Sequence, residues 1–168
     1  MTDNRIGWTE FALLTESAAA KTLLTCCSSP AWAQAVAARR PYSNIDELLI
    51  AADAELTALS EGEVDRALAG HPRIGERTED ANSAREQAGM ADADDAVRVG
   101  IAVGNEEYEA KFGHVYLVCA SGRTSEELLA VLMERIGNDA ETERRIVRQE
   151  LGKINRIRLR RLLITEDA

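Results

Sequence analysis

The chain is poor in the residue types that build cross-linked or metal-bound sites. Its 168 residues include two histidines, three prolines and three cysteines, and aromatic side chains make up 4%. Cys26 and Cys27 are adjacent and Cys119 is distant, a pattern that fits neither a disulfide framework nor a zinc site. We therefore expect buried, reduced thiols, and a packing role for Cys119, which follows an apolar run.

Long hydrophobic runs and an excess of positive charge are also missing. No stretch has the length and apolar character of a transmembrane helix, and no segment reads as a signal peptide. The formal net charge is −9, whereas nucleic acids and anionic membranes attract clustered positive charge. We therefore expect a cytoplasmic protein that binds neither nucleic acid nor a membrane.

What the chain does contain favours helices. Its length suits one domain covering residues 1–168, and Ala, Leu, Glu and Arg are abundant. Caps, prolines and apolar spacing predict an all-α, single-domain bundle of about eight helices, with one short extended segment over residues 114–119. Seven of the predicted helices begin at Ser17, at Pro30, within 43–46, at Ser60, within 91–94, at Thr124 and at Asn138. One more helix contains Ser83 to Gln87.

The most informative motif is the His-Pro-Arg-Ile-Gly sequence of residues 71–75. A residue before proline avoids the α conformation, so His71 should end a helix and project from a fixed turn. Ser83, Glu86 and Gln87 follow at helical spacing, which places a hydroxyl, a carboxyl and a carboxamide on one face. Together they predict a small-molecule site. The alternative is that Ser83 and Glu86 form a capping box and only satisfy backbone amides.

A second candidate lies in the last predicted helix. Val147, Leu151, Ile154 and Leu162 mark its core-facing stripe, and Arg158 falls on the same stripe. A guanidinium group there is costly unless it is paired. It therefore either reaches outward to solvent, pairs with a buried carboxylate, or binds an anionic ligand.

Four motifs occur in a defined order along the chain. They are His-Pro-Arg-Ile-Gly at 71–75, Ser-x-x-Glu-Gln-x-Gly at 83–89, Asn-x-x-Tyr-x-x-Lys-Phe-Gly at 105–113, and Lys-Ile-x-x-x-Arg-Leu at 153–159. With them the chain resembles the OHCU decarboxylase family, which acts on 2-oxo-4-hydroxy-4-carboxy-5-ureidoimidazoline in urate degradation. The resemblance covers residues 6 to 163. Each motif is short, but four in order over one domain are specific.

The resemblance implies an all-α homodimer that releases CO2 to give (S)-allantoin and uses neither a metal nor an organic cofactor. It implies that His71 is the acid/base residue and that Glu86 takes part in catalysis. The implied substrate contacts are Pro72, Ser83, Glu86, Gln87 and Arg158, together with main-chain groups of His114, Val115, Tyr116, Leu117 and Val118.

Two other classes of function stay open at this point. In a non-catalytic helical interaction module, the turn at His71 would be only a corner and Arg158 a buried ion pair. In a metal hydrolase, His71, His114 and nearby carboxylates would bind the ion, although two histidines without His-x-x-x-His spacing give this reading little support. Turnover of the imidazoline substrate would count against the module, and insensitivity to chelators would count against the hydrolase.

Overall fold

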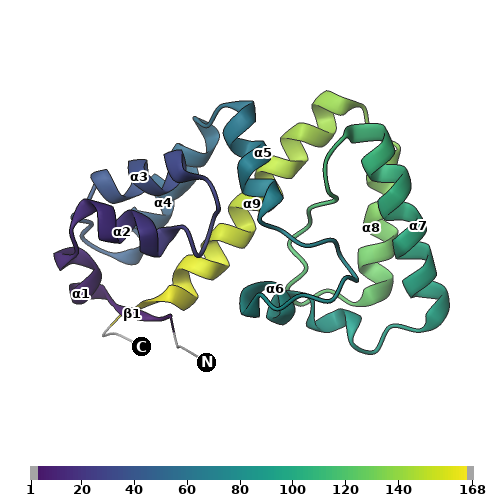
Figure 1. The fold of residues 1–168 in the computed structure, drawn as a ribbon, viewed down its shortest axis with the longest axis horizontal. Coiled ribbons are helices and arrows are strands. Elements are labelled where there is room, and N and C mark those ends of the chain that lie inside the picture. The colour runs from purple at the N-terminus through teal and green to yellow at the C-terminus, as the bar shows by residue number, and fades with distance from the viewer. Residues whose placement is uncertain (1–3, 166–168) are drawn as a thin grey trace. The chain divides into compact units, whose positions relative to one another are not determined.

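The computed structural model describes residues 4–165, and within them helices dominate (Figure 1). The α-helices are α1 (Trp8–Leu13), α2 (Glu16–Leu23), α3 (Pro30–Ala38), α4 (Ile45–Thr57), α5 (Glu61–Ala69), α6 (Ala81–Glu86), α7 (Asp95–Phe112), α8 (Ser125–Ile136) and α9 (Ala140–Leu162). One 3-10 helix, η1 (Ala88–Met90), follows α6. The strands β1 (Ile6–Gly7) and β2 (Leu163–Ile164) pair in parallel. The predicted all-α fold is confirmed.

The chain divides into two compact units. The first contains the residues up to Gly70 together with those from Gly152 onward, and the second runs from His71 to Leu151. Helix α9 supplies its first half to the second unit and its second half to the first. That residues 1–168 act as one domain stays a prediction.

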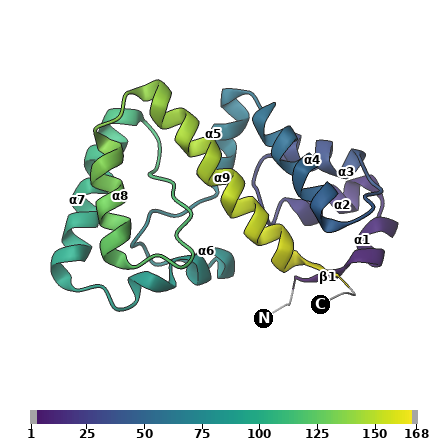
Figure 2. The same cartoon turned by 180° about the vertical axis from the view of Figure 1, so that it is seen from behind.

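The first unit is built around α2, α3 and α4. These helices lie side by side in both ribbon views (Figures 1 and 2). Ser29 caps α3 by accepting a hydrogen bond from the Trp32 amide at 3.1 Å, and Pro30 takes the first helical position. The Trp32 indole is fully buried and donates to the Ala52 carbonyl at 3.0 Å. The predicted helix start at Pro30 is therefore correct.

The second unit packs α7 against α8, which also lie side by side in both views. Its core includes Ile101, Tyr108, Tyr116, Leu128 and Leu132. Residues 114–120, between the two helices, belong to neither a helix nor a strand. Three consecutive residues of this segment, 116–118, are buried. The segment therefore contributes to the core without extending a sheet.

Two helix starts differ from the prediction. Thr15, rather than Ser17, caps α2 by accepting from the Ala18 amide. Asp139, rather than Asn138, accepts from the first turn of α9. Several residues with capping side chains stand close together at both places, so spacing alone does not identify the cap. Helix α1 was not predicted, because six residues are too few to show helical periodicity.

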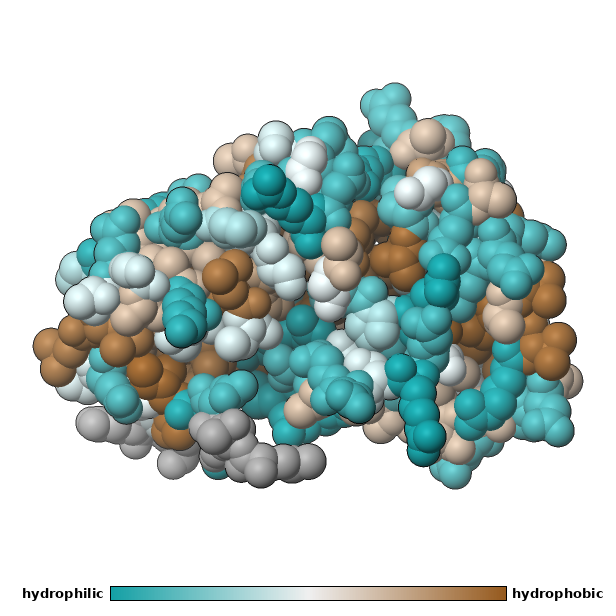
Figure 3. All heavy atoms as spheres, in the orientation of Figure 1, coloured by the Kyte–Doolittle hydropathy of each residue, from teal (hydrophilic) through white to brown (hydrophobic). Residues whose placement is uncertain are grey.

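Hydrophilic side chains dominate the molecular face shown in Figure 3. Brown spheres at its right-hand edge lie over α7, where Val99 and Val103 are exposed four residues apart. Met133 of α8 is exposed as well. The second unit thus presents apolar residues to solvent on both of its packed helices.

A buried ion pair joins the helices of the second unit. Arg135 of α8 and Glu143 of α9 are 4% and 0% exposed, and the Arg135 Nε group donates to Glu143 Oε1 at 2.7 Å. The Tyr108 hydroxyl donates to the same carboxylate oxygen, and Arg135 also donates to the Leu117 carbonyl. Burial alone would raise the pKa of Glu143, but hydrogen bonds from Arg135, Tyr108 and Asn138 lower it below its ordinary value.

We expect Glu143→Gln to destabilise the protein by about 3–5 kcal/mol near pH 7, because it leaves the Arg135 charge buried without its partner. The folded pKa of Glu143 is lowered, so its contribution is complete above the unfolded value of about 4.3 and disappears as the pH falls through the folded pKa. Urea unfolding should therefore show the gap between wild type and variant narrowing in acid. Glu141→Gln, exposed on the same helix, should change stability by less than about 0.5 kcal/mol. Equal losses in the two variants would contradict this account.

Candidate active site

The loop that carries His71 begins where α5 ends. Helix α5 stops at Ala69, and residues 71–80 contain no helix or strand. His71 and Pro72 are half-buried, as expected for a turn held at the edge of the protein. Ile74 is buried in the core of the second unit. The prediction that His71 follows a helix end and opens a loop is confirmed.

The short helix α6 holds the predicted polar face. Its N-cap is Asp80, whose carboxylate accepts from the Ser83 amide at 2.8 Å. Ser83 therefore lies inside the first turn, and Glu86 is the last helical residue. The capping-box alternative is wrong, because Asp80 already supplies the capping oxygen. Ser83 and Glu86 are instead buried, at 2% and 7% exposed, on one face of the helix.

Gln87 joins the histidine loop to α6. The Gly75 amide donates to Gln87 Oε1 at 3.0 Å, and Gln87 Nε2 donates to the Arg73 carbonyl at 3.4 Å. Both ends of this carboxamide are thus bonded to the backbone that follows His71 and Pro72. The structure brings the first two predicted motifs together through this side chain. Its contact with the substrate stays a prediction.

Sequence reasoning missed the role of Asn105. This residue of α7 is 5% exposed, and its Nδ2 group donates to the Ile74 carbonyl at 3.0 Å. The signal was present, because Asn105 is a polar residue next to the buried stripe formed by Ile101, Gly104 and Tyr108. A polar side chain in a core requires a hydrogen-bond partner, and here the partner is the histidine loop.

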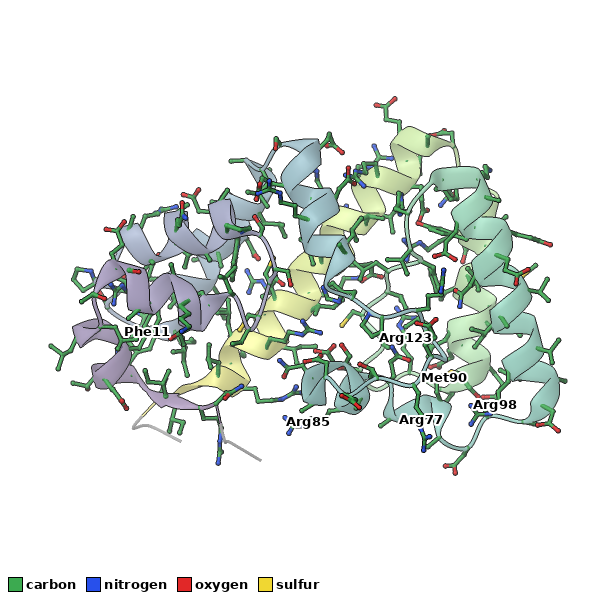
Figure 4. The ribbon with its side chains drawn as sticks, viewed as in Figure 1. Phe11, Arg77, Arg85, Met90, Arg98 and Arg123 are labelled. Atoms are coloured by element: carbon green, nitrogen blue, oxygen red, sulfur yellow. The ribbon has the colours of Figure 1, made fainter. Side chains whose placement is uncertain are left out.

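Two glycines allow this arrangement. Gly75 has φ of +88°, a left-handed conformation that other residues rarely adopt. At Gly89 in η1, a Cβ atom would lie 2.0 Å from the Arg123 carbonyl oxygen, so only glycine permits the close approach. Figure 4 shows Met90, the next residue of η1, beside Arg98, which donates to the Met90 carbonyl at 2.8 Å. These contacts fix η1, and with it the end of α6, against α7.

The segment predicted to offer main-chain contacts, residues 114–118, is bound to neighbouring side chains at His114 and at Leu117. The His114 ring is half-buried and lies edge-on to Tyr108, with centroids 5.5 Å apart, and its Nδ1 atom is 3.1 Å from the Val115 carbonyl oxygen. Two residues further on, the Leu117 carbonyl accepts from Arg135. His114 thus has a packing role. That His71 rather than His114 is the acid/base residue stays a prediction.

Arg158 belongs to the first unit, whereas the other predicted site residues belong to the second. It is 6% exposed, and its Nη1 group donates to the Cys26 carbonyl at 3.2 Å. The alternative in which Arg158 reaches out to solvent is therefore wrong. Burial raises the pKa of the Cys27 thiol, and Arg158 opposes that shift. None of the three cysteines forms a disulfide; Cys26 and Cys27 are buried, as predicted, whereas Cys119, which was also expected to be buried, is half-buried.

Within residues 4–165, no group of three or more His, Cys, Asp or Glu side chains is placed to hold a metal ion. In the same part of the chain, no helix has the length and apolar character needed to cross a membrane. The second unit contains a hollow of about 350 Å³ whose wall includes Arg73, Ile74 and Gly75. His71, Ser83 and Glu86 are not part of its lining.

Comparison with known proteins identifies relatives of this chain. The sequence model of the OHCU decarboxylase family matches residues 13–160. A 2-oxo-4-hydroxy-4-carboxy-5-ureidoimidazoline decarboxylase of Amia calva is 29% identical over 143 residues, which cover 80% of this chain and 81% of that protein. One of Haloferax volcanii is 27% identical over 134 residues, covering 78% of this chain and 80% of that protein.

A solved structure shows the same fold. The crystal structure of OHCU decarboxylase in the presence of (S)-allantoin superimposes with a TM-score of 0.72 at 26% identity, and the match covers 81% of this chain and 92% of that one. The family match spans all four sequence motifs, from the histidine loop to Arg158. The chain therefore belongs to the OHCU decarboxylase family, the carboxy-lyases of urate degradation.

Proposed function

We propose that this protein converts 2-oxo-4-hydroxy-4-carboxy-5-ureidoimidazoline to (S)-allantoin and CO2. Family membership supports the reaction. In this chain, the main support for the proposed reaction is that the histidine loop is hydrogen-bonded to α6. Gln87 bonds that loop at Arg73 and Gly75, and the same helix carries buried Ser83 and Glu86.

The substrate supplies its own electron sink. When the bond from the ring carbon to CO2 breaks, its electron pair forms a double bond to the neighbouring ring carbon, and the electrons of the ring C=N bond move onto nitrogen. The ring nitrogen takes up a proton, and the resulting enol loses its hydroxyl proton and becomes the ring carbonyl. The carbon that bears the ureido group takes up a proton and becomes the stereocentre of allantoin. Because these steps need no further electron acceptor, we propose a reaction without metal or organic cofactor.

The protein must therefore orient the substrate and place one proton on one face of the ring. We propose His71 for that proton, because imidazole exchanges protons readily near neutral pH. Glu86 would accept hydrogen bonds from the ring hydroxyl or the ureido N–H groups and so stabilise the developing enol. Ser83 and Gln87 would contact the same substrate, and Pro72 would shape its binding surface.

Two further groups complete the proposed substrate contacts. The main chain from His114 to Val118 offers N–H and C=O groups, of which the Val115 and Leu117 carbonyls already have partners in the protein. Arg158 suits a carboxylate or a ureido carbonyl, because its planar guanidinium group forms paired hydrogen bonds with such oxygens. We propose both groups as substrate contacts from the family motifs they occupy.

We also propose that the protein is a cytoplasmic homodimer whose ligand is the small-molecule substrate. The net charge of −9 supports the expectation that it binds neither nucleic acid nor a membrane surface. Val99 and Val103 of α7 and Met133 of α8 are exposed apolar residues. A dimer interface over these helices would bury them.

The activity itself is the first test. Urate, a urate oxidase and a hydroxyisourate hydrolase generate the substrate in the cuvette, and circular dichroism follows optically active allantoin. We expect the protein to accelerate its appearance and to give the S enantiomer in excess. Chelators should leave the rate unchanged, because no step requires a metal. A rate and an enantiomeric excess equal to those of the spontaneous reaction would leave a non-catalytic interaction module as the better account.

The two histidines offer a matched pair of variants. We expect His71→Asn to keep the fold and to bind allantoin, but to lose most of the catalysed rate, because asparagine forms hydrogen bonds without relaying a proton. His114→Asn should lose far less, since the His114 ring packs against Tyr108. Initial rates and allantoin titrations check both variants. A loss at His114 equal to or larger than that at His71 would show that the acid/base role is assigned to the wrong residue.

Glu86→Gln separates binding from helix stability. The variant keeps the size of the side chain, and Asp80 rather than Glu86 supports the cap of α6. We expect turnover to fall about tenfold or more, since each tenfold is about 1.4 kcal/mol of lost transition-state stabilisation. Thermal unfolding should change little. Glu79→Gln, at an exposed position just before α6, is the control and should keep full activity. Loss of stability with retained turnover would mean that Glu86 is structural.

A further inference from the structure

We propose that Asn105 and Gln87 are positioning residues that set the direction of His71 by holding the backbone of residues 73–75. This inference rests on the proposed role of His71 in the reaction. Neither side chain needs to touch the proton that His71 moves. Each acts through the loop whose first residue is His71, and for Gln87 this role is additional to its proposed contact with the substrate.

The geometry shows three consecutive residues held by two carboxamides. The Arg73 carbonyl accepts from Gln87 Nε2, the Ile74 carbonyl accepts from Asn105 Nδ2, and the Gly75 amide donates to Gln87 Oε1. Asn105 comes from α7, and Gln87 caps the end of α6. A carboxamide suits this task, because it carries a donor and an acceptor on one planar group. The two side chains thus supply the hydrogen bonds that a helix or a strand would otherwise provide.

The other restraints on this part of the loop are the burial of Ile74 and one backbone hydrogen bond, which the Glu76 amide donates to the Arg73 carbonyl at 3.2 Å. Ile74 is its one buried residue between positions 73 and 76. Arg73 forms ion pairs with Glu76 and Glu109, but its side chain is 49% exposed, and ion pairs of exposed groups contribute little. The same residues border the hollow of about 350 Å³, and the packing of this part of the loop comes from Ile74, which lies in the core with Met90 and Ile101. The hydrogen bonds from Asn105 and Gln87 therefore join this turn to α7 and α6 and contribute to fixing the path of its backbone.

Burying Asn105 is unfavourable for the stability of the fold, which indicates a different role for this residue. Its Oδ1 atom is buried and has no hydrogen-bond partner within the described part of the protein. An unsatisfied buried acceptor is unfavourable, so an asparagine at this position is a poor choice for core packing. Its Nδ2 group nevertheless meets the Ile74 carbonyl at 3.0 Å. The residue gives up stability to hold the loop.

Kinetics give the first test. Asn105→Asp keeps the shape but sets a carboxylate oxygen against the Ile74 carbonyl, so the loop loses its anchor. We expect kcat to fall about tenfold or more, because small misplacements of a reacting group cost up to about a hundredfold. KM should change by less than about threefold, since the substrate contacts remain. Glu106→Gln is the matched control at the next, exposed position of α7 and should keep both constants.

Two spectroscopic measurements follow the loop without any reaction. The chain has only two histidines, so a spectrum of 15N-histidine-labelled protein shows the side chain of His71 beside that of His114 as an internal reference. We expect Asn105→Asp to shift or broaden the His71 signals and to leave the His114 signals in place. Hydrogen exchange at the Gly75 amide reports on Gln87. Gln87→Glu keeps the acceptor, whereas Gln87→Met removes it, so protection should decrease from wild type to Glu to Met.

The outcomes separate the two claims. If the unmodified protein has no decarboxylase activity, the proposed function fails. The histidine spectrum and the hydrogen exchange of the Gly75 amide then still decide whether Asn105 and Gln87 hold the loop. If activity is present but Asn105→Asp keeps its kcat and its His71 signals, the positioning role is wrong. If Gln87→Glu raises KM without changing Gly75 protection, Gln87 acts by binding the substrate and not by holding the loop. Should Asn105→Asp fail to fold, the Gln87 series carries the test alone.

Discussion

The arrangement of the second unit depends on the buried pair of Arg135 and Glu143. This pair brings together α8, α9 and, through Tyr108, α7. Arg135 also holds the Leu117 carbonyl, which fixes the segment after α7 although that segment has no regular hydrogen bonding of its own. Removing two charges from water is expensive, and the pair offsets that cost only because hydrogen bonds saturate the carboxylate. Its value therefore lies in fixing one arrangement of three helices and a loop.

The same design recurs on a smaller scale at the histidine loop. There the backbone again lacks regular structure, and side chains from neighbouring helices bind it, here through the neutral carboxamides of Gln87 and Asn105. In both cases, polar side chains on the helices form hydrogen bonds with backbone groups of a loop. In this member of the OHCU decarboxylase family, the precision of the proposed site thus comes from α6 and α7, which flank the loop and are themselves packed.

Much of this could be predicted from the sequence, and the failures have a common cause. The turn at His71, the face of Ser83 and Glu86, and the helix start at Thr124 are local patterns, and all appear in the structure. The cap of α9 was misassigned because Asn138 donates to the Glu143 carboxylate, a partner that spacing alone does not identify. Asn105 was missed because its partner is a backbone carbonyl 31 residues away, and a carbonyl has no sequence signature. Patterns identify side chains, but they do not identify which backbone those side chains bind.

We propose that His71 delivers a proton to one face of the substrate carbon that bears the ureido group. Running the reaction in D2O tests it directly, with NMR locating the deuteron and circular dichroism giving the handedness of the product. We expect (S)-allantoin with one deuteron at that carbon from the unmodified protein, and from His71→Asn the loss of most of the catalysed rate together with nearly equal amounts of the two enantiomers. Deuterated (S)-allantoin in excess from His71→Asn at the normal rate would contradict it.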